Sequence, residues 1–289
     1  MAMLVTGICC LVGYQSTYAV SSVDLKGLTI SPLRTELEIS PGTSLDGALT
    51  VTNSTDKPMM VNLTAEEFSV IDQQYDYAFT AESNTAKWVN FNPAQADLAV
   101  GETKKVQYSV GVPLSAEPGG RYISLFASND ISMQTDSIAR QRVASLLYIT
   151  VSGDVTRAGH LISFSSPWAI GGDSNWSTAL QNTGTTHYRS RYSVKVMNIL
   201  GSGVVATNQG SALILPGTVR LVSDKLPSPQ IPGIYKAVYF IGLGDTPAIS
   251  ETRYFIYMPP LAILLSIVIV TILIYRIVKR HQRRKNKKT

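Results

Sequence analysis

The C-terminal stretch Tyr254–Thr289 constrains this chain more than any other part. Between Tyr257 and Tyr275 there is no charged residue, and residues 261–274 are apolar apart from one serine and one threonine. At a rise of about 1.5 Å per residue, such a run matches the hydrocarbon core of a bilayer. We therefore predict a transmembrane helix over residues 257–275, with tyrosines in the interfacial belt at both ends. A buried core helix at the end of a domain is the alternative.

A dense basic tail, residues 276–289, follows the predicted span. By the positive-inside rule, this tail stays in the cytoplasm and residues 1–253 lie outside. The residues that set this topology are Arg276, Lys279, Arg280, Arg283, Arg284 and Lys285. The whole chain has 25 basic and 20 acidic residues, but without the tail the balance is 17 to 20. The basic pI therefore indicates a membrane-facing tail and not a nucleic-acid-binding protein.

Residues 1–20 are typical of a secretory signal peptide. An apolar run over residues 3–13 precedes small residues near Ala19, although no Lys or Arg opens it. The segment could therefore also remain as an anchor. Both cysteines, Cys9 and Cys10, lie in this stretch. Its removal would leave no thiol, which excludes disulfides, zinc–thiolate sites and cysteine nucleophiles.

Residues 28–153 predict a first β domain. Apolar and polar residues alternate over residues 106–112 and again over residues 147–151, and Pro and Gly separate such segments. A period of two with β-branched and aromatic residues indicates short antiparallel strands. Several of them in one domain suggest an immunoglobulin-like β-sandwich. We find no helical periodicity before the predicted span.

Residues 158–253 predict a second domain of the same kind, because three turn features recur in the same order. Each domain has an asparagine at a strand end, then a glycine turn, then a tyrosine near a strand start: Asn53, Gly101 and Tyr122, followed by Asn182, Gly217 and Tyr235. Asparagine can bond the backbone of its own turn, and glycine supplies positive φ. A tyrosine can bury its ring while its hydroxyl bonds backbone, as in a tyrosine corner. Shared turn chemistry in unrelated β domains is the alternative.

The expected fold is therefore mainly β, with two tandem immunoglobulin-like sandwiches and one C-terminal transmembrane helix. The segment 152–159 is the expected linker. Tyr254 runs almost directly into the predicted span. We therefore expect the second domain to stand close to the lipid surface.

One polar stretch, Ser128–Gln141, departs from the β pattern between two strongly β segments. A hairpin needs only two to five connecting residues, and long loops on a rigid sandwich are where binding surfaces tend to lie. We interpret this stretch as a candidate binding loop; an exposed loop without a partner is the alternative. Its apolar anchors and charged residues would be Ile131, Met133, Ile138, Arg140 and Arg142.

The sequence contains no motif for catalysis, cofactor binding or metal binding. Its three histidines lack the spacing of metal ligands, and no nucleophile elbow, phosphate loop or dinucleotide fingerprint is present. The acidic pairs Glu66/Glu67 and Asp72/Asp76 could in principle serve a glycoside hydrolase. They fit solvated faces or turns better, so we expect no enzyme and no cofactor.

Several turn motifs of the first domain carry a resemblance to a known family. The order of Ile39–Gly42, Leu49–Asn53, Val100–Thr103 and Pro118–Tyr122 resembles the first domain of the WxL-interacting cell-surface proteins of Gram-positive bacteria. It is also similar to chaperone-like sandwich domains. The second domain, the span and the basic tail match that family's layout. The resemblance implies a membrane-anchored surface protein that binds partner proteins or wall material.

These features together predict a non-enzymatic, single-pass plasma-membrane protein. Its outward-facing domains would recognise a surface protein or a cell-wall polymer by a loop or an exposed sheet edge. One alternative is an accessory subunit of a membrane secretion or transport complex, in which the span makes the main contacts. Another is a hydrolase of wall glycan, which would need paired carboxylates in a cleft.

Overall fold

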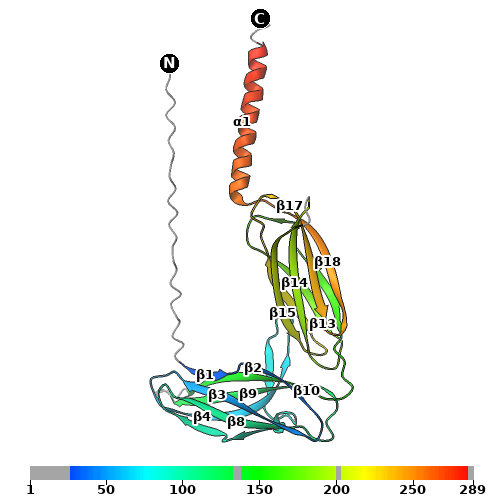
Figure 1. Ribbon diagram of the computed structural model, residues 1–289. Helices are drawn as coiled ribbons and strands as arrows, with labels where there is room; N and C mark the ends of the chain where they lie inside the picture. Colours follow the sequence, from blue (N-terminus) through cyan, green and yellow to red (C-terminus); the bar gives the residue numbers. More distant parts are fainter. Residues whose placement is uncertain (1–26, 133–137, 200–202, 286–289) are drawn as a thin grey trace.

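The computed structural model describes residues 27–132, 138–199 and 203–285. The predicted signal peptide and Met133 lie outside these ranges. Four β-sheets and one long helix make up the regular structure of the described chain (Figure 1). The fold class is as predicted, with immunoglobulin-like sandwiches in tandem and an apolar helix at the C-terminal end.

The first sandwich packs a four-stranded sheet against a six-stranded sheet. The four-stranded sheet has the order β1-β3-β8-β6, formed by β1 (Leu28–Ser31), β3 (Ser44–Asn53), β8 (Thr103–Gly111) and β6 (Val89–Asn92). The six-stranded sheet has the order β2-β10-β9-β4-β5, and β7 also pairs with β4. Its strands are β2 (Arg34–Ile39), β10 (Ile138–Val151), β9 (Gly119–Ser132), β4 (Met59–Val70), β5 (Tyr77–Thr80) and β7 (Gln95–Leu98). A short 3-10 helix, η1 (Ala86–Trp88), precedes β6.

The second sandwich repeats this plan with a three-stranded and a five-stranded sheet. The three-stranded sheet has the order β11-β13-β16, formed by β11 (Gly159–Ser165), β13 (Ser174–Asn182) and β16 (Val219–Leu226). The five-stranded sheet has the order β12-β18-β17-β14-β15, formed by β12 (Ala169–Ile170), β18 (Thr246–Tyr257), β17 (Gly233–Leu243), β14 (Tyr188–Asn198) and β15 (Val204–Ile214). The last strand, β18, continues to Tyr257, beyond the predicted domain end at residue 253.

Both sandwiches are closed at one edge in the same way. The first strand of each sandwich, β1 or β11, pairs antiparallel within the smaller sheet. The chain then crosses to the larger sheet, where the next strand pairs parallel with the strand that comes last in that sandwich's sequence. This parallel partner is β2 on β10 in the first sandwich and β12 on β18 in the second. Because this topology recurs, the two halves of the described chain are built on one plan.

The apolar face of each strand lies in a core, which explains the period of two in the sequence. Val106, Val110 and Ile149 are almost fully buried in the first core, and Leu180 and Tyr239 in the second. Each fully buried apolar side chain contributes roughly 1.5–3 kcal/mol relative to exposure. Neither core contains a cysteine, so among the described residues packing and hydrogen bonds hold the sandwiches together.

The repeated turn features have the same geometry in both sandwiches. The side-chain amide of Asn53 donates to Leu98 O and Ala99 O, and that of Asn182 donates to Ile214 O and Thr186 O. The N–H of Gly101 donates to Asn53 O, and that of Gly217 donates to Asn182 O, both within 2.9–3.0 Å. The φ angles of these glycines are +73° and +72°. The predicted internal parallel is thus present in atomic detail.

The two tyrosines of the parallel differ. Tyr235 forms the predicted corner, since its Oη donates to Ile231 O at 2.7 Å. Tyr122 does not, because its Oη lies 3.4 Å from Nδ1 of His187 in the second sandwich. The expectation of a tyrosine corner is therefore wrong for Tyr122. Its hydroxyl contacts a side chain of the neighbouring sandwich instead.

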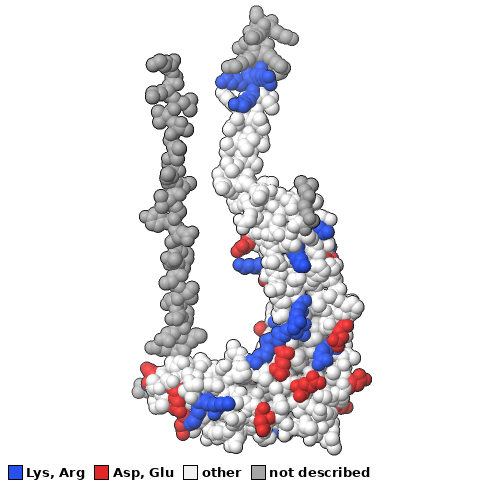
Figure 2. All heavy atoms as spheres, viewed as in Figure 1, with Lys and Arg blue, Asp and Glu red and all other residues white. Residues whose placement is uncertain are grey.

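The helix α1 (Pro260–Lys285) begins three residues after β18 ends and continues into the predicted tail. Its most apolar part, Pro260–Arg280, is long enough to cross a bilayer and is not buried by the described chain. In Figure 1 the second sandwich and α1 stand upright, and the first sandwich lies across their lower end. Figure 2 shows that α1 is free of charge until Lys and Arg gather at its far end.

Candidate functional site

The hairpin of β9 and β10 is the most extended element of the first sandwich. The two strands stay in register over fourteen pairs, from Gly119 opposite Val151 to Ser132 opposite Ile138. Its neighbours are shorter, because β4 pairs with β9 only as far as Ser128 and β2 pairs with β10 only from Leu146. Beyond the pair of Ser128 and Arg142, the hairpin is therefore a two-stranded ribbon in the described chain.

The outer edge of β10 has no strand partner between Ile138 and Ser145 among the described residues. The N–H of Leu146 donates to Leu33 O at 3.0 Å, on the side where β2 lies. In a strand, alternate residues direct their N–H and C=O to opposite edges. Going outward from Leu146, the residues Ile138, Arg140, Arg142 and Ala144 thus direct both groups to the free edge. We define these four residues as the open edge.

One side chain of the open edge is held in a fixed position. Cζ of Arg142 lies 3.2 Å from the centre of the Phe126 ring, and its guanidinium forms an ion pair with Glu66. Phe79 packs edge-on against Phe126, with ring centres 5.0 Å apart. This stack lies on the face of the larger sheet that points away from the core. A planar cation held on an aromatic ring is already ordered for contact with a partner.

The structure changes the expectation for the polar stretch 128–141. Ser128 and Ile131 lie in β9, and Ile138 and Arg140 lie in β10, so most of the stretch continues the sheet. The predicted long loop is therefore wrong for these residues, because the ladder between the strands extends to Ser132. Arg142 lies on the open edge, and Met133 falls outside the described residues. An exposed sheet edge was expected, but the sequence did not show which strand forms it, since sequence shows side-chain alternation and not the length of neighbouring strands.

At its other end, the hairpin contacts the second sandwich. The N–H of Gly120 donates to Thr185 O at 3.0 Å, and the hydroxyls of Thr150 and Thr186 lie 3.0 Å apart in a buried position. Gly119 has φ +135°, and a Cβ there would lie 3.0 Å from the same Thr185 oxygen. The glycine pair thus permits a close approach of the two backbones.

The linker is held by the same turn of the second sandwich. The N–H of Thr156 donates to the Thr185 hydroxyl at 2.9 Å, and the N–H of Thr185 donates to Thr156 O at 3.0 Å. The N–H of Thr183 donates to Ala158 O at 2.8 Å. Such reciprocal bonds leave the linker little freedom.

A cluster of aromatic rings fills the junction between the sandwiches. Tyr122 and Tyr148 each lie within 5.8 Å of the ring of His187, and Phe68 packs edge-on against Tyr148. These rings join the core of the second sandwich in one continuous cluster. Burial lowers the pKa of His187 to about 4 and raises the pKa of both tyrosines far above the usual value. These three rings are therefore uncharged around neutral pH.

Tyr75 anchors the junction from a second direction. It lies at the tip between β4 and β5, with φ +72°, and it is buried in the second sandwich. Its hydroxyl accepts the N–H of Leu215 at 2.8 Å, and Cζ of Arg220 lies 4.2 Å from its ring centre. The N–H of Leu221 donates to Gln73 O at 2.9 Å. A left-handed backbone costs a tyrosine about 1–3 kcal/mol, so the surrounding contacts must hold it in place.

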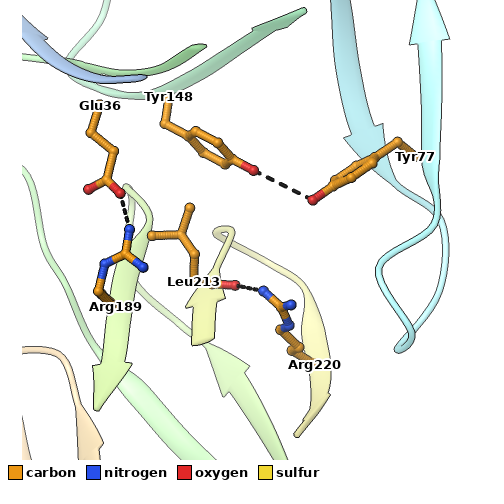
Figure 3. A network of polar contacts seen from close by, with 6 residues as sticks. All are labelled: Glu36, Tyr77, Tyr148, Arg189, Leu213 and Arg220. Atoms are coloured by element: carbon orange, nitrogen blue, oxygen red, sulfur yellow. Dashed lines mark hydrogen bonds and ion pairs between the residues drawn. The ribbon is translucent and has the colours of Figure 1, made fainter. Parts of the chain in front are cut away.

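Polar contacts surround the aromatic cluster (Figure 3). Arg189 of the second sandwich forms an ion pair with Glu36 of β2, and Arg220 donates to Leu213 O at 2.6 Å. A crevice of about 390 Å³ opens beside this ion pair. Its lining comes from both sandwiches: Glu36, Leu37, Glu38, Thr150, Arg157, His187, Tyr188, Arg189, Gly244 and Asp245.

The acidic pairs have structural partners. Glu66 and Glu67 are consecutive in β4, so they point to opposite faces, and Glu66 is paired with Arg142. Oδ1 of Asp72 accepts the N–H of Asp76 at 3.0 Å and so closes the turn that carries Tyr75. In the part of the chain that the structure describes, no group of three or more His, Cys, Asp or Glu side chains could hold a metal ion.

The residues predicted to set topology follow the apolar part of α1. The helix does not end at residue 275 as predicted but continues to Lys285, so the basic segment from Arg276 onward begins as helix. A short connection between residues 257 and 260 joins the second sandwich to α1. The described structure therefore places the open edge and α1 at opposite ends of one connected body (Figure 1).

Comparison with known proteins finds only solved structures of similar fold. No protein-family model and no curated protein matches the chain. The solved structure of the class 5 fimbriae chaperone CfaA is 11% identical and covers 78% of this chain and 99% of that chain, with a TM-score of 0.39. A chain of the CsuC–CsuE chaperone–tip subunit complex of Acinetobacter baumannii is 13% identical, with coverages of 80% and 99% and a TM-score of 0.38.

A chain of the Salmonella enterica SafA pilin–SafB chaperone complex is 10% identical, with coverages of 81% and 97% and a TM-score of 0.38. All three comparisons concern β-sandwich proteins at low identity. The resemblance to the WxL-interacting proteins stays a prediction.

Proposed function

We propose that this chain is a membrane-anchored, extracytoplasmic binding protein that recognises a surface protein through the open edge of β10. The observation that carries this proposal is the side of β10 from Ile138 to Ala144, which pairs with no strand in the described part of the chain. An extended segment of a partner would add there as a further strand, with main-chain hydrogen bonds for affinity and Arg142 for side-chain specificity.

The chemistry of this edge favours a protein over a wall polymer. Four residues in alternation offer main-chain donors and acceptors at the repeat of a β-strand. A glycan site would need an open aromatic platform, but Arg142 covers Phe126 and pairs with Glu66. The open edge therefore suits an extended peptide.

The rest of the molecule supports a presenting role. The junction around Tyr75 and His187 joins the sandwiches into one body, and α1 serves as the membrane span. The strands β14 and β17 have eleven residues each, or about 36 Å at about 3.3 Å per residue. The second sandwich would thus hold the open edge at a defined height above the lipid.

A capture experiment with edge variants tests this function. The full chain in detergent micelles is incubated with surface proteins and, separately, with purified wall glycan of the host. Ala144→Pro removes one N–H of the open edge, and edge strands tolerate proline. Ala144→Thr is the matched control, because it also enlarges the side chain but keeps the N–H. We expect one retained protein, lost with Ala144→Pro and kept with Ala144→Thr.

A shortened hairpin gives an independent check. Replacing residues 130–140 by Asn-Gly leaves Asn129 opposite Gln141, a pair whose main-chain groups face each other, and joins them by a two-residue turn. This variant should fold, because both cores lie on the retained part, but it should bind more weakly. Retention on glycan alone, or equal protein binding by all edge variants, would contradict the proposal.

A further inference from the structure

Large apolar side chains are exposed at the end of the second sandwich from which α1 emerges. Trp168 is 75% exposed, Ile231 69% and Ile234 50%. Tyr254 and Met258 are exposed at the same end. Soluble surfaces seldom concentrate large apolar groups in this way, so the concentration marks a contact surface.

Backbone hydrogen bonds fix Trp168 next to the start of α1. The N–H of Ile256 donates to Trp168 O at 2.9 Å, and the N–H of Met258 donates to Ile170 O at 2.9 Å. These bonds belong to the parallel pairing of β12 with the end of β18. Trp168 is thus held level with the last residues before Pro260, where α1 begins.

The other apolar residues belong to the same end of the sheet. Ile234 is the register partner of Ile256, at the start of β17 and the end of β18. Ile231 immediately precedes this strand start, and its carbonyl accepts the Tyr235 hydroxyl at 2.7 Å. We define Trp168, Ile231, Ile234, Tyr254, Ile256 and Met258 as the basal face.

The connections at this end carry few charges. Residues 227–232 have no charged side chain, and residues 166–173 have only Asp173, which pairs with Lys225 at 3.6 Å. Figure 2 shows mostly uncharged atoms where α1 leaves the sandwich. Tryptophan and tyrosine favour the headgroup level of a bilayer, because they combine an apolar ring with a polar N–H or O–H.

We propose that the basal face docks into the headgroup region of the same bilayer that α1 spans, with Trp168 and Ile231 in contact with lipid. This inference rests on the proposed membrane anchoring. Because β12 and β18 hold Trp168 beside Ile256, four residues before Pro260, insertion of α1 up to its first residues brings the basal face to the lipid surface. The second contact limits the tilt of the body on α1. It thereby fixes the direction in which the open edge faces.

Depth measurements on the full chain test this docking. The protein is reconstituted into phosphatidylcholine vesicles with a minor share of phosphatidylglycerol. Nitroxide labels are placed singly at Trp168→Cys, Ile231→Cys, Leu33→Cys and Ile269→Cys, after both native cysteines are replaced by serine. Leu33 is the matched control, since it is 71% exposed but lies in the first sandwich. Ile269, in the middle of α1, reports whether the span itself is in lipid.

Oxygen and a water-soluble nickel complex report the depth of each label. We expect labels at residues 168 and 231 to be shielded from nickel relative to the label at residue 33. Equal nickel access at residues 33, 168 and 231, with residue 269 in lipid, would overturn the docking and leave the anchor intact. Nickel access at residue 269 would overturn the anchor as well.

Tryptophan fluorescence provides a check without labels. The chain has three tryptophans, and Trp176 is buried. Shallowly brominated lipids should quench the wild-type chain more than Trp168→Phe, and the difference isolates Trp168. Identical quenching of the two proteins would contradict the docking, because the most exposed tryptophan would then not reach the lipid.

Discussion

The hydroxyl of Tyr75 accepts a hydrogen bond from the backbone N–H of Leu215 at 2.8 Å, across 140 residues of sequence. Thr218 Oγ1 lies 2.8 Å from the same hydroxyl and donates its own proton to Leu215 O. Since a threonine hydroxyl has one proton, Tyr75 must donate to Thr218. The tip of the first sandwich thus completes a turn of the second.

Removal of this hydroxyl should weaken the described body measurably. Tyr75→Phe keeps the ring on Arg220 but leaves the buried Leu215 N–H without its partner. We expect the free energy of unfolding to fall by about 1–3 kcal/mol, which urea denaturation of the full chain in detergent can measure. Tyr77→Phe is the control, because that hydroxyl lies 3.5 Å from Tyr148, at the limit of a hydrogen bond. Equal losses in both variants would contradict the role of Tyr75.

His187 should make the stability depend on pH. Burial lowers its pKa from 6.5 to about 4, with Glu36 opposing this shift and Arg157 and Arg189 adding to it. Between these values the unfolded chain binds a proton that the folded chain does not, so acid favours unfolding. The free energy of unfolding should fall by about 3 kcal/mol as the pH drops from about 6.5 to about 4.

The measurement compares unfolding of wild type and His187→Gln across this range. Carboxylates titrate in the same window in both proteins, so only the difference between them reports on His187. Below a pH of about 4 the difference should become constant. Parallel pH profiles for the two proteins would show that folding does not lower the pKa of His187, and would contradict this prediction.

The sequence predicted the turns better than the surfaces. Asn53 and Asn182 could be predicted because asparagine ends a strand by bonding its own turn, which is a local effect. The fold class followed from alternation, because the core requires one apolar face on each strand. These signals depend on residues close together in the chain.

The junction and the open edge depend on residues far apart in sequence, so the sequence did not reveal them. Tyr122 has the pattern of a corner tyrosine, yet the second sandwich redirects its hydroxyl to His187. The edge of β10 is open because β2 is short, which is a property of another strand. Arg142 was predicted as a contact residue, but its stacking on Phe126 required the register between β9 and β10.

The repeated asparagines should be among the least replaceable polar residues. The amide of Asn182 is fully buried and donates to Thr186 O at 2.9 Å and Ile214 O at 2.8 Å. Asn182→Ala leaves both carbonyls without this donor, so we expect a loss of about 2–4 kcal/mol in the free energy of unfolding. Asn175→Ala, at an exposed position of β13, is the control and should change stability little. A small loss for Asn182→Ala would mean that water can replace the amide.

The basic end of α1 should determine which way the chain crosses the membrane. The apolar part of the helix has no charged residue before Arg276, so the charge difference between its two ends is large. We expect that replacing Arg276, Lys279, Arg280, Arg283, Arg284 and Lys285 by glutamine gives mixed or inverted orientation, because the signal that keeps this end in the cytoplasm is lost. Protease protection in sealed vesicles measures the orientation: in wild type, the sandwiches should be digested only from the outer side. The control exchanges each Lys for Arg and each Arg for Lys, which keeps the charge and should keep the orientation. If the glutamine variant were as uniformly oriented as wild type, orientation would have to be set by the segment before β1 or by the folded sandwiches themselves.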